Sequence, residues 1–411
     1  MKKSLLCFIL AFAFAFGCLF VPQSVSATQT DDFSQYSTYN WLEKFVTANP
    51  SRTTGTAGEQ QTANWLADEI SAMGFDLSKQ TFAVPVSGVA GASGNADTCN
   101  VIAKKVYDQQ AKTVVIGAHY DNATNLYNGA VVSGGEGAMD NGSGVAVVLA
   151  VMQKIYQQNP VLPFNLEFVF FGAEELGMLG SNHYVSKLSQ QQKDNILLMI
   201  NADVVASGDK LYVWGEDKNN PQSDYFADIS GGKIVKTPAN TKVMGINSGY
   251  RPYYSVCQMS DHMEFLSAGI PVAAFFSGNF DADSFSFVEN AGKNDVSHTP
   301  NDTINYLKQN FGTGFAVNMQ TVADVIYDGV IQNADEFATA VADARNYIVD
   351  DFWLSLGNAS LIALVFMACA GIFAYNYYKK LQKRAILGTA EVKTNSVFEK
   401  PDEDDIFTFR S

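Results

Sequence analysis

The stretch Thr113–Asp121, TVVIGAHYD, decides the fold. Its first six residues carry no charge, and the run ends in a histidine and an aspartate. A short apolar run without polar alternation is typical of a strand that is buried on both faces of a sheet. Three further runs share this character and make four candidate buried strands: NLEFVFFGA (165–173), LLMINAD (197–203) and IPVAAFF (270–276).

Helical patterns separate these strands. The segment EQQTANWLADEISAMGF (59–75) repeats its apolar residues at helical spacing and contains a glycine where the helix should stop. The segments SGVAVVLAVMQKIYQQ (143–158) and FAVNMQTVADVIYDGV (315–330) are also helical in character. Alternating strands and helices predict an α/β domain with a largely parallel central sheet.

Composition narrows the classes of function. Apolar residues make up 47% of the 411, which is enough for a sizeable core, and charged residues only 17%, which excludes wholesale disorder. The formal net charge of -15 argues against nucleic acid or anionic lipid as the main partner. Outside the apolar ends, only Cys99 and Cys257 remain, and their pairing is left open.

The two ends carry export and membrane signals. Residues 1–27 predict a secretory signal peptide, with two lysines, an apolar run and VSA at its end. Residues 353–378 are long and apolar enough to cross a bilayer, and KKLQKR follows, which predicts a cytoplasmic C-terminus. We therefore expect an extracellular domain (28–330), a helical stalk (331–352) and a cytoplasmic tail (379–411) at the cell membrane.

Polar groups that could do chemistry stand where the predicted strands end. In open α/β sheets, ligands bind beyond the carboxyl ends of the strands, so these groups should converge on one edge. Two more candidates lie in the turns GAMDNGSG and SHTPNDT. The full set is His119, Asp121, Glu174, Glu175 and Asp203 at strand ends, with Asp140 and His298 in the turns.

This set suits a divalent metal. The whole chain has only four histidines, so two of them among so many acids indicate zinc or another divalent cation. The adjacent Glu174 and Glu175 would repel each other on a buried edge unless a cation compensated them. One can bind the metal while its neighbour acts as a base. A carboxylate such as Asp140 has two oxygens and can bridge two metals.

Read in order, the motifs HYD, AMDNGSG, GAEELG, NAD and SHTPND resemble the signature of the di-zinc aminopeptidases, a family that also includes glutamate carboxypeptidase. The resemblance runs from about Asn40 to Tyr327. It implies the fold of the zinc exopeptidases (phosphorylase/hydrolase-like), a three-layer sandwich with a mostly parallel mixed central sheet between helices. Within this family, the sequence resembles the bacterial leucyl aminopeptidase type. The predicted membrane span would make it a membrane-anchored member.

The resemblance also implies roles for single residues and a cofactor of two zinc ions. Asp140 would bridge the two ions. Glu174 would be the general base and Asp121 would orient a zinc-bound imidazole. The other ligands would be His119 and Asp203 for one zinc, and Glu175 and His298 for the other. Members of the family can add a tyrosine as an oxyanion donor near the SDH motif. Tyr253 and Tyr254 lie near that motif here, but neither is included in the expected site.

Three classes of function follow from these motifs. An aminopeptidase that acts on peptides outside the cell is favoured. A carboxypeptidase or dipeptidase on the same two-metal site is the alternative, whereas a one-zinc glutaminyl cyclase fits the complete ligand set poorly. A catalytically inactive receptor or adhesin would have lost ligands or the base, and here none is missing. Neither His183 nor His262 is expected to bind metal.

Overall fold

A computed structural model describes residues 32–86, 94–127, 130–133, 135–208, 210–215, 220–237, 260–278, 296–342 and 344–345. The predicted signal peptide, membrane span and cytoplasmic tail lie outside these residues, as do Tyr253, Tyr254 and Cys257. Cys99 is a free thiol. Within the described ranges, no helix combines the length and the apolar character that crossing a membrane requires.

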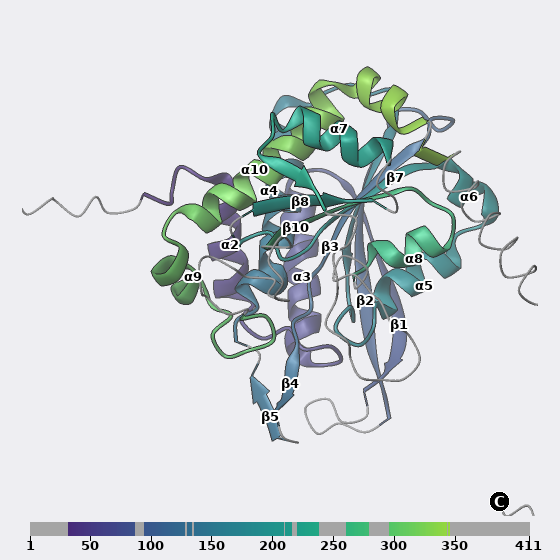
Figure 1. The fold of residues 1–411 in the computed structure, drawn as a ribbon. Coiled ribbons are helices and arrows are strands. Elements are labelled where there is room, and N and C mark those ends of the chain that lie inside the picture. The colour runs from purple at the N-terminus through teal and green to yellow at the C-terminus, as the bar shows by residue number, and fades with distance from the viewer. Residues whose placement is uncertain are drawn as a thin grey trace, which may run out of the picture. The chain divides into compact units, whose positions relative to one another are not determined.

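An eight-stranded mixed sheet forms the centre of the domain (Figure 1). Its order is β1-β2-β6-β3-β7-β10-β8-β9. The four central strands, β6, β3, β7 and β10, run parallel, whereas β1, β2 and β8 pair antiparallel to their inner neighbours. The strands are β1 (Asp76–Pro85), β2 (Asn95–Lys105), β3 (Thr113–His119), β6 (Asn165–Phe171), β7 (Ile196–Ala202), β8 (Lys210–Trp214), β9 (Ile234–Lys236) and β10 (Val272–Gly278).

Helices cover both faces of this sheet (Figure 1). Alternate residues of one strand belong to different cores: Val114 and Ile116 of β3 pack into a large cluster, and Val115 packs into a second one. The large cluster lies under α2 (Ser37–Ala48), α3 (Ala57–Ala72), α4 (Ser143–Gln158), α7 (Pro221–Ile229), α9 (Ile304–Phe311) and α10 (Gly314–Ile326), and the second under α5 (Leu179–Lys187) and α8 (His262–Ser267). The remaining short helix is α6 (Gln190–Asn195). The α/β fold with a mixed sheet between helices is thus confirmed.

The four strands expected from the sequence are β3, β6, β7 and β10, with ends that shift by one or two residues. The expected helix over 59–75 is α3. Its first turn is capped by the Thr56 hydroxyl, which accepts from the Glu59 amide, and Gly74 follows its end with a φ of 72°. A separate two-stranded sheet, β4 (Thr124–Tyr127) with β5 (Ala130–Ser133), extends from the end of β3 (Figure 1).

The packed domain continues beyond the predicted boundary at residue 330. After α10 and η4 (Tyr327–Gln332), residues 334–342 are helical. Phe337 and Val341 of this segment are buried, and Phe337 contacts the ring of Phe164. The first part of the expected stalk is therefore part of the core, because its apolar residues recur at helical spacing and bury one face.

Candidate metal centre

The candidate ligands meet at one edge of the sheet. His119 is the last residue of β3, Asp203 directly follows β7, and Glu174 and Glu175 lie just beyond the end of β6. Because β3, β6 and β7 run parallel, their carboxyl ends bring these side chains to the same edge. Burial is deep: the side chain of His119 is only 1% exposed, and those of Asp203 and Glu175 are 8% exposed.

Asp140 connects the two histidines from its position in η2 (Ala138–Gly142), directly before α4. Its Oδ1 lies 3.2 Å from His119 Nε2 and its Oδ2 lies 3.0 Å from His298 Nε2. His119 Nε2 is also 3.3 Å from Asp203 Oδ1, and His298 Nε2 is 3.0 Å from Glu175 Oε2. The five side chains therefore form two clusters that share one carboxylate. We call these the His119 half and the His298 half.

The arrangement fits a pair of zinc ions. Two atoms that bind one tetrahedral zinc at about 2.0–2.1 Å lie about 3.3 Å apart, close to the 3.0–3.3 Å found between imidazole nitrogens and carboxylate oxygens here. The ligand atoms of His119, Asp140 and Glu175 all lie within 4.8 Å of one another. Glu175 Oε1 is buried without a hydrogen-bond partner in the described part of the chain. Such an oxygen normally has a partner, which a cation would supply.

The electrostatics of these side chains also favour a cation. Burial, together with the neighbouring carboxylates, raises the pKa of Glu174 well above its usual range. Burial and the Asp140 carboxylate raise the pKa of Glu175 to about 7. Burial lowers the pKa of His298, but hydrogen bonds to Asp140 and Glu175 outweigh this effect and raise it to about 12. These pKa shifts favour protons where the clustered carboxylates need positive charge, and metal binding would displace such protons.

Asp121 connects the segments that carry His119, Glu174 and Glu175. Its Oδ1 accepts a hydrogen bond from the backbone amide of Glu174 at 3.1 Å and lies 3.5 Å from Nδ1 of His119. Its Oδ2 accepts from the backbone amide of Glu175 at 3.2 Å and from the Thr54 hydroxyl at 2.8 Å. One buried carboxylate thus holds the backbone of both glutamates and faces the second ring nitrogen of a ligand histidine, as a partner of a metal-bound imidazole does.

Residues 100–323, more than half of the chain and the part that contains all seven candidate residues, match peptidase family M28. The chain belongs to this family. Among its relatives, aminopeptidase YwaD of Bacillus subtilis is 29% identical over 259 residues, which are 57% of this chain and 50% of that protein. The chain spans about half the length of the curated relatives it matches.

Two solved structures share the M28 chain's fold. The zinc aminopeptidase BSAP from Bacillus subtilis has a TM-score of 0.50 and 19% identity, over 69% of this chain and 93% of that one. A glutaminyl cyclase from an Acidobacteriales bacterium has a TM-score of 0.53 and 18% identity, over 74% of this chain and 93% of that one. At such low identity these likenesses concern the fold, which peptidases and cyclases share, so the choice between activities depends on the site.

One residue of the M28 site that sequence reasoning did not single out is Asp302, although SHTPND contains it. Its buried carboxylate accepts hydrogen bonds from the backbone amides of Met139 at 2.6 Å and Asp140 at 3.0 Å. Burial raises the pKa of Asp302 to about 8. Since Asp302 is four residues after His298, it joins the loop of one ligand to the backbone of another.

Backbone strain also gathers at the M28 site. Ala173, Val204 and His298 have positive φ angles of 59°, 50° and 58°. Each is one of the seven candidate residues or lies directly beside one. The left-handed conformation is rare for residues other than glycine, above all for a β-branched one, and costs of order 1–3 kcal/mol per residue. The surrounding packing must therefore stabilise these turns.

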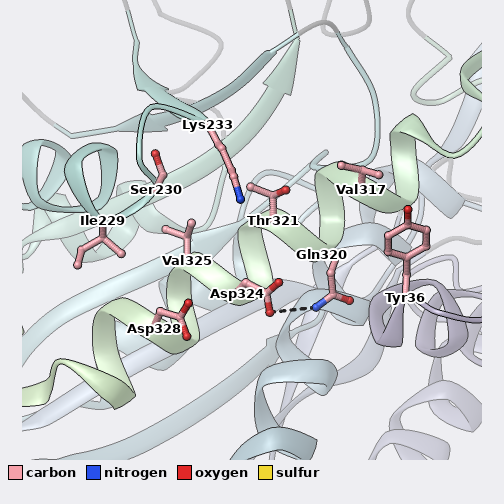
Figure 2. Close-up of a pocket in the computed structure, with 10 residues that line it drawn as sticks. All are labelled: Tyr36, Ile229, Ser230, Lys233, Val317, Gln320, Thr321, Asp324, Val325 and Asp328. Carbon is pink, nitrogen blue, oxygen red and sulfur yellow. Dashed lines mark hydrogen bonds between the residues drawn. The ribbon is translucent and has the colours of Figure 1, made fainter.

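The other polar residues of interest lie elsewhere in the M28 domain. His183 stacks on the ring of Phe82, with centroids 4.4 Å apart, and His262 packs edge-on against Trp214. A surface pocket of about 250 Å³ is lined by residues of α7, α10 and η4 together with Tyr36, Ser230 and Lys233. Figure 2 shows these side chains, with the hydrogen bond from Gln320 to Asp324. None of the seven candidate residues lines this pocket.

Proposed function

We propose that this M28 chain is a metal-dependent aminopeptidase with two zinc ions, held by the His119 and His298 halves of the site. The observation that carries the proposal is the position of Asp140, whose two oxygens face two different imidazoles at 3.2 Å and 3.0 Å. A complete pair of ligand sets beside a free glutamate favours hydrolysis over a one-metal cyclase. The relative from Bacillus subtilis is named an aminopeptidase, which supports the proposal that this chain acts at the amino end of peptides.

Each residue has a chemical task in this proposal. When bound, the zinc ions would lower the pKa of a water and polarise the scissile carbonyl. Glu174 takes the proton of the attacking water and delivers it to the leaving amine. Asp121 keeps the Glu174 backbone and the His119 ring in place. The peptide carbonyl carbon gains the water oxygen as its bond to nitrogen breaks.

The direct test is a pair of glutamate variants of the purified 411-residue chain. Glu174→Gln should retain zinc but lose a factor of about 10²–10⁴ in kcat, because a general base contributes that much. Glu167→Gln is the matched control. This buried glutamate lies on β6, the strand that precedes Glu174, but its side chain contacts Tyr184 and Lys104, away from the ligands. It should keep wild-type kcat. Ordinary turnover by Glu174→Gln would show that another group is the base.

Substrate class is tested with a panel of aminoacyl anilides and peptides. Turnover that stops on chelation and returns with zinc supports the aminopeptidase. If the chain held two metal ions but hydrolysed no anilide, a carboxypeptidase or dipeptidase activity would be favoured instead. A chain that binds no metal would overturn the enzyme proposal.

We also propose that the domain lies outside the cell membrane, held by residues 353–378 after removal of 1–27. The apolar span, the KKLQKR sequence that follows it and the signal pattern support this placement. Protease added to intact cells should degrade the domain and spare an epitope at the C-terminus. An unaffected domain in intact cells would contradict the proposal.

A further inference from the structure

Arg52 is a wholly buried cation whose hydrogen bonds go to backbone carbonyls. Its side chain is 0% exposed. Nε donates to the carbonyl of Tyr120 at 2.6 Å, Nη2 to Gly137 at 2.9 Å, and Nη1 to Glu136 at 2.7 Å and Asn49 at 2.9 Å. No salt bridge joins the guanidinium to a carboxylate in the described structure. A buried charge is costly unless its hydrogen bonds are satisfied, and here four carbonyls satisfy it.

Three of these carbonyls belong to the two loops that carry His119 and Asp140, and the fourth, that of Asn49, directly follows α2. Tyr120 lies between His119 and Asp121, so its carbonyl is one residue from a ligand. Glu136 and Gly137 directly precede η2, which contains Asp140. The guanidinium therefore fixes the separation of the loop after β3 from the loop before α4. We call these four hydrogen bonds the Arg52 clamp.

Other contacts hold the Arg52 clamp in register. The backbone amide of Arg52 donates to Asn122 Oδ1 at 2.8 Å, so both the backbone and the side chain of Arg52 contact the loop after β3. The guanidinium lies over the ring of Phe45, with Cζ of Arg52 4.8 Å from the ring centroid. A Cβ on Gly137 would lie only 2.6 Å from Nη2, and the φ of Gly137 is 57°. Glycine at this position is thus required for the close approach.

We propose that Arg52 is a positioning residue that sets the zinc affinity of the His119 half, by fixing the loop of His119 against the loop of Asp140. The inference rests on the proposed two-zinc function. The clamp donates to no carbonyl of the segments that carry Glu175 and His298. It reaches the His298 half only through the shared Asp140 and through Glu136, whose amide donates to the Asp302 carbonyl at 2.8 Å, so the effect should be larger in the His119 half. A lysine would keep the charge but has no planar fork for four carbonyls, so Arg52→Lys isolates the geometry.

The chain offers a matched control in Arg345. Its guanidinium also donates to backbone carbonyls, those of Asp194 at 2.8 Å, Ile196 at 2.9 Å and Lys193 at 2.9 Å. Ile196 begins β7, whereas Asp203 follows its end, so this second clamp lies at the opposite end of the same strand. Arg345→Lys removes a similar set of hydrogen bonds to carbonyls far from the ligands, together with an exposed salt bridge from Nη2 to Asp194 Oδ1 at 3.1 Å.

The experiment measures zinc affinity by chelator competition on the metal-free 411-residue chain, in two single-site backgrounds. With His298→Ala, only the His119 half should remain, and Arg52→Lys should weaken its zinc binding by about 10–100-fold, as loss of support behind a ligand does. With His119→Ala, only the His298 half should remain, and the same change should alter affinity by less than about threefold. Arg345→Lys should leave both affinities unchanged.

The outcomes separate this inference from the proposed function. Equal weakening of both halves, no weakening of either, or the same weakening by Arg345→Lys would overturn the role of Arg52 and leave the function intact. A wild-type chain without zinc would overturn both. If Arg52→Lys does not fold, as judged by circular dichroism, Arg52→Gln replaces it, because its uncharged amide has only two N–H groups for the four carbonyls. That variant should show the same selectivity, and unchanged affinity in both backgrounds would contradict the inference.

Discussion

His119 and His298 both lie within 3.2 Å of Asp140, yet one belongs to the sheet and the other to a loop. The His119 side chain is 1% exposed at the end of β3, whereas that of His298 is 49% exposed and has a positive φ. Asp121 supports the first ring, and the loop of the second is connected to Asp140 through the backbone bonds of Asp302. The comparison separates a buried, preformed half, that of His119, from a half that lies partly at the surface, that of His298.

The largest expected effect is a difference in stability between two alanine variants. In the metal-free chain, His119→Ala leaves buried carboxylates without their partner, which should lower the free energy of unfolding by about 3 kcal/mol. His298→Ala removes a half-exposed ring, and water can take its place, so the loss should stay within about 1 kcal/mol. Urea unfolding of both variants after chelation measures the difference.

Zinc content provides the control for this pair. Each variant should lose one of two ions, since each removes a ligand from one half only. Equal destabilisation by the two changes would mean that the exposed loop is as rigidly built as the strand end, and the contrast between the halves would be lost.

The preformed half is also the more predictable one from sequence. Uninterrupted apolar runs identified β3, β6, β7 and β10, and polar residues directly after three of them identified His119, Glu174, Glu175 and Asp203 as neighbours. Edge strands escaped detection. In β1, DLSKQTFAVP, exposed and buried positions alternate only in its second half, so no continuous apolar run marks it.

Residues that position the metal ligands could be predicted from the sequence only where they belong to a recognisable motif. Asp121 was expected beside His119, two residues along the same strand end. Arg52 was not, because its acceptors are backbone carbonyls, which any residue provides and no sequence pattern marks. Asp302 likewise accepts from backbone amides. The missing information is the spatial approach of two loops.

A second prediction concerns pH. In the metal-free chain the pKa of His298 is about 12 and that of Glu175 about 7, and the pKa of His119 is also raised well above its ordinary value, since nearby carboxylates outweigh its burial. Zinc needs neutral imidazole and ionised carboxylate, so it must displace these protons. Affinity should rise with pH, about tenfold per unit for each proton displaced. Below about pH 7 the His298 half displaces two protons, from His298 and Glu175, and above it one.

The change of slope distinguishes the halves. Competition titrations at pH 6, 7 and 8 in the His119→Ala background should show the steeper dependence below about pH 7. The His298→Ala background provides the comparison, because the half that remains there lacks Glu175, the group whose pKa of about 7 causes the change of slope. A zinc affinity that does not vary with pH would show that the metal-free site holds no such protons.

The smallest predicted effect probes Asp121 through Thr54. Thr54→Val is nearly isosteric and removes the 2.8 Å hydrogen bond to Asp121 Oδ2, which still accepts from the Glu175 amide. We expect the free energy of zinc binding to weaken by about 1 kcal/mol, which is about fivefold in affinity. The effect should be larger in the His119 half, because Asp121 faces the ring of His119. Thr38→Val is the control, a buried threonine of α2 that contacts Gln320. If both variants reduced thermal stability alike and neither changed zinc affinity, Asp121 would not depend on Thr54 for its position.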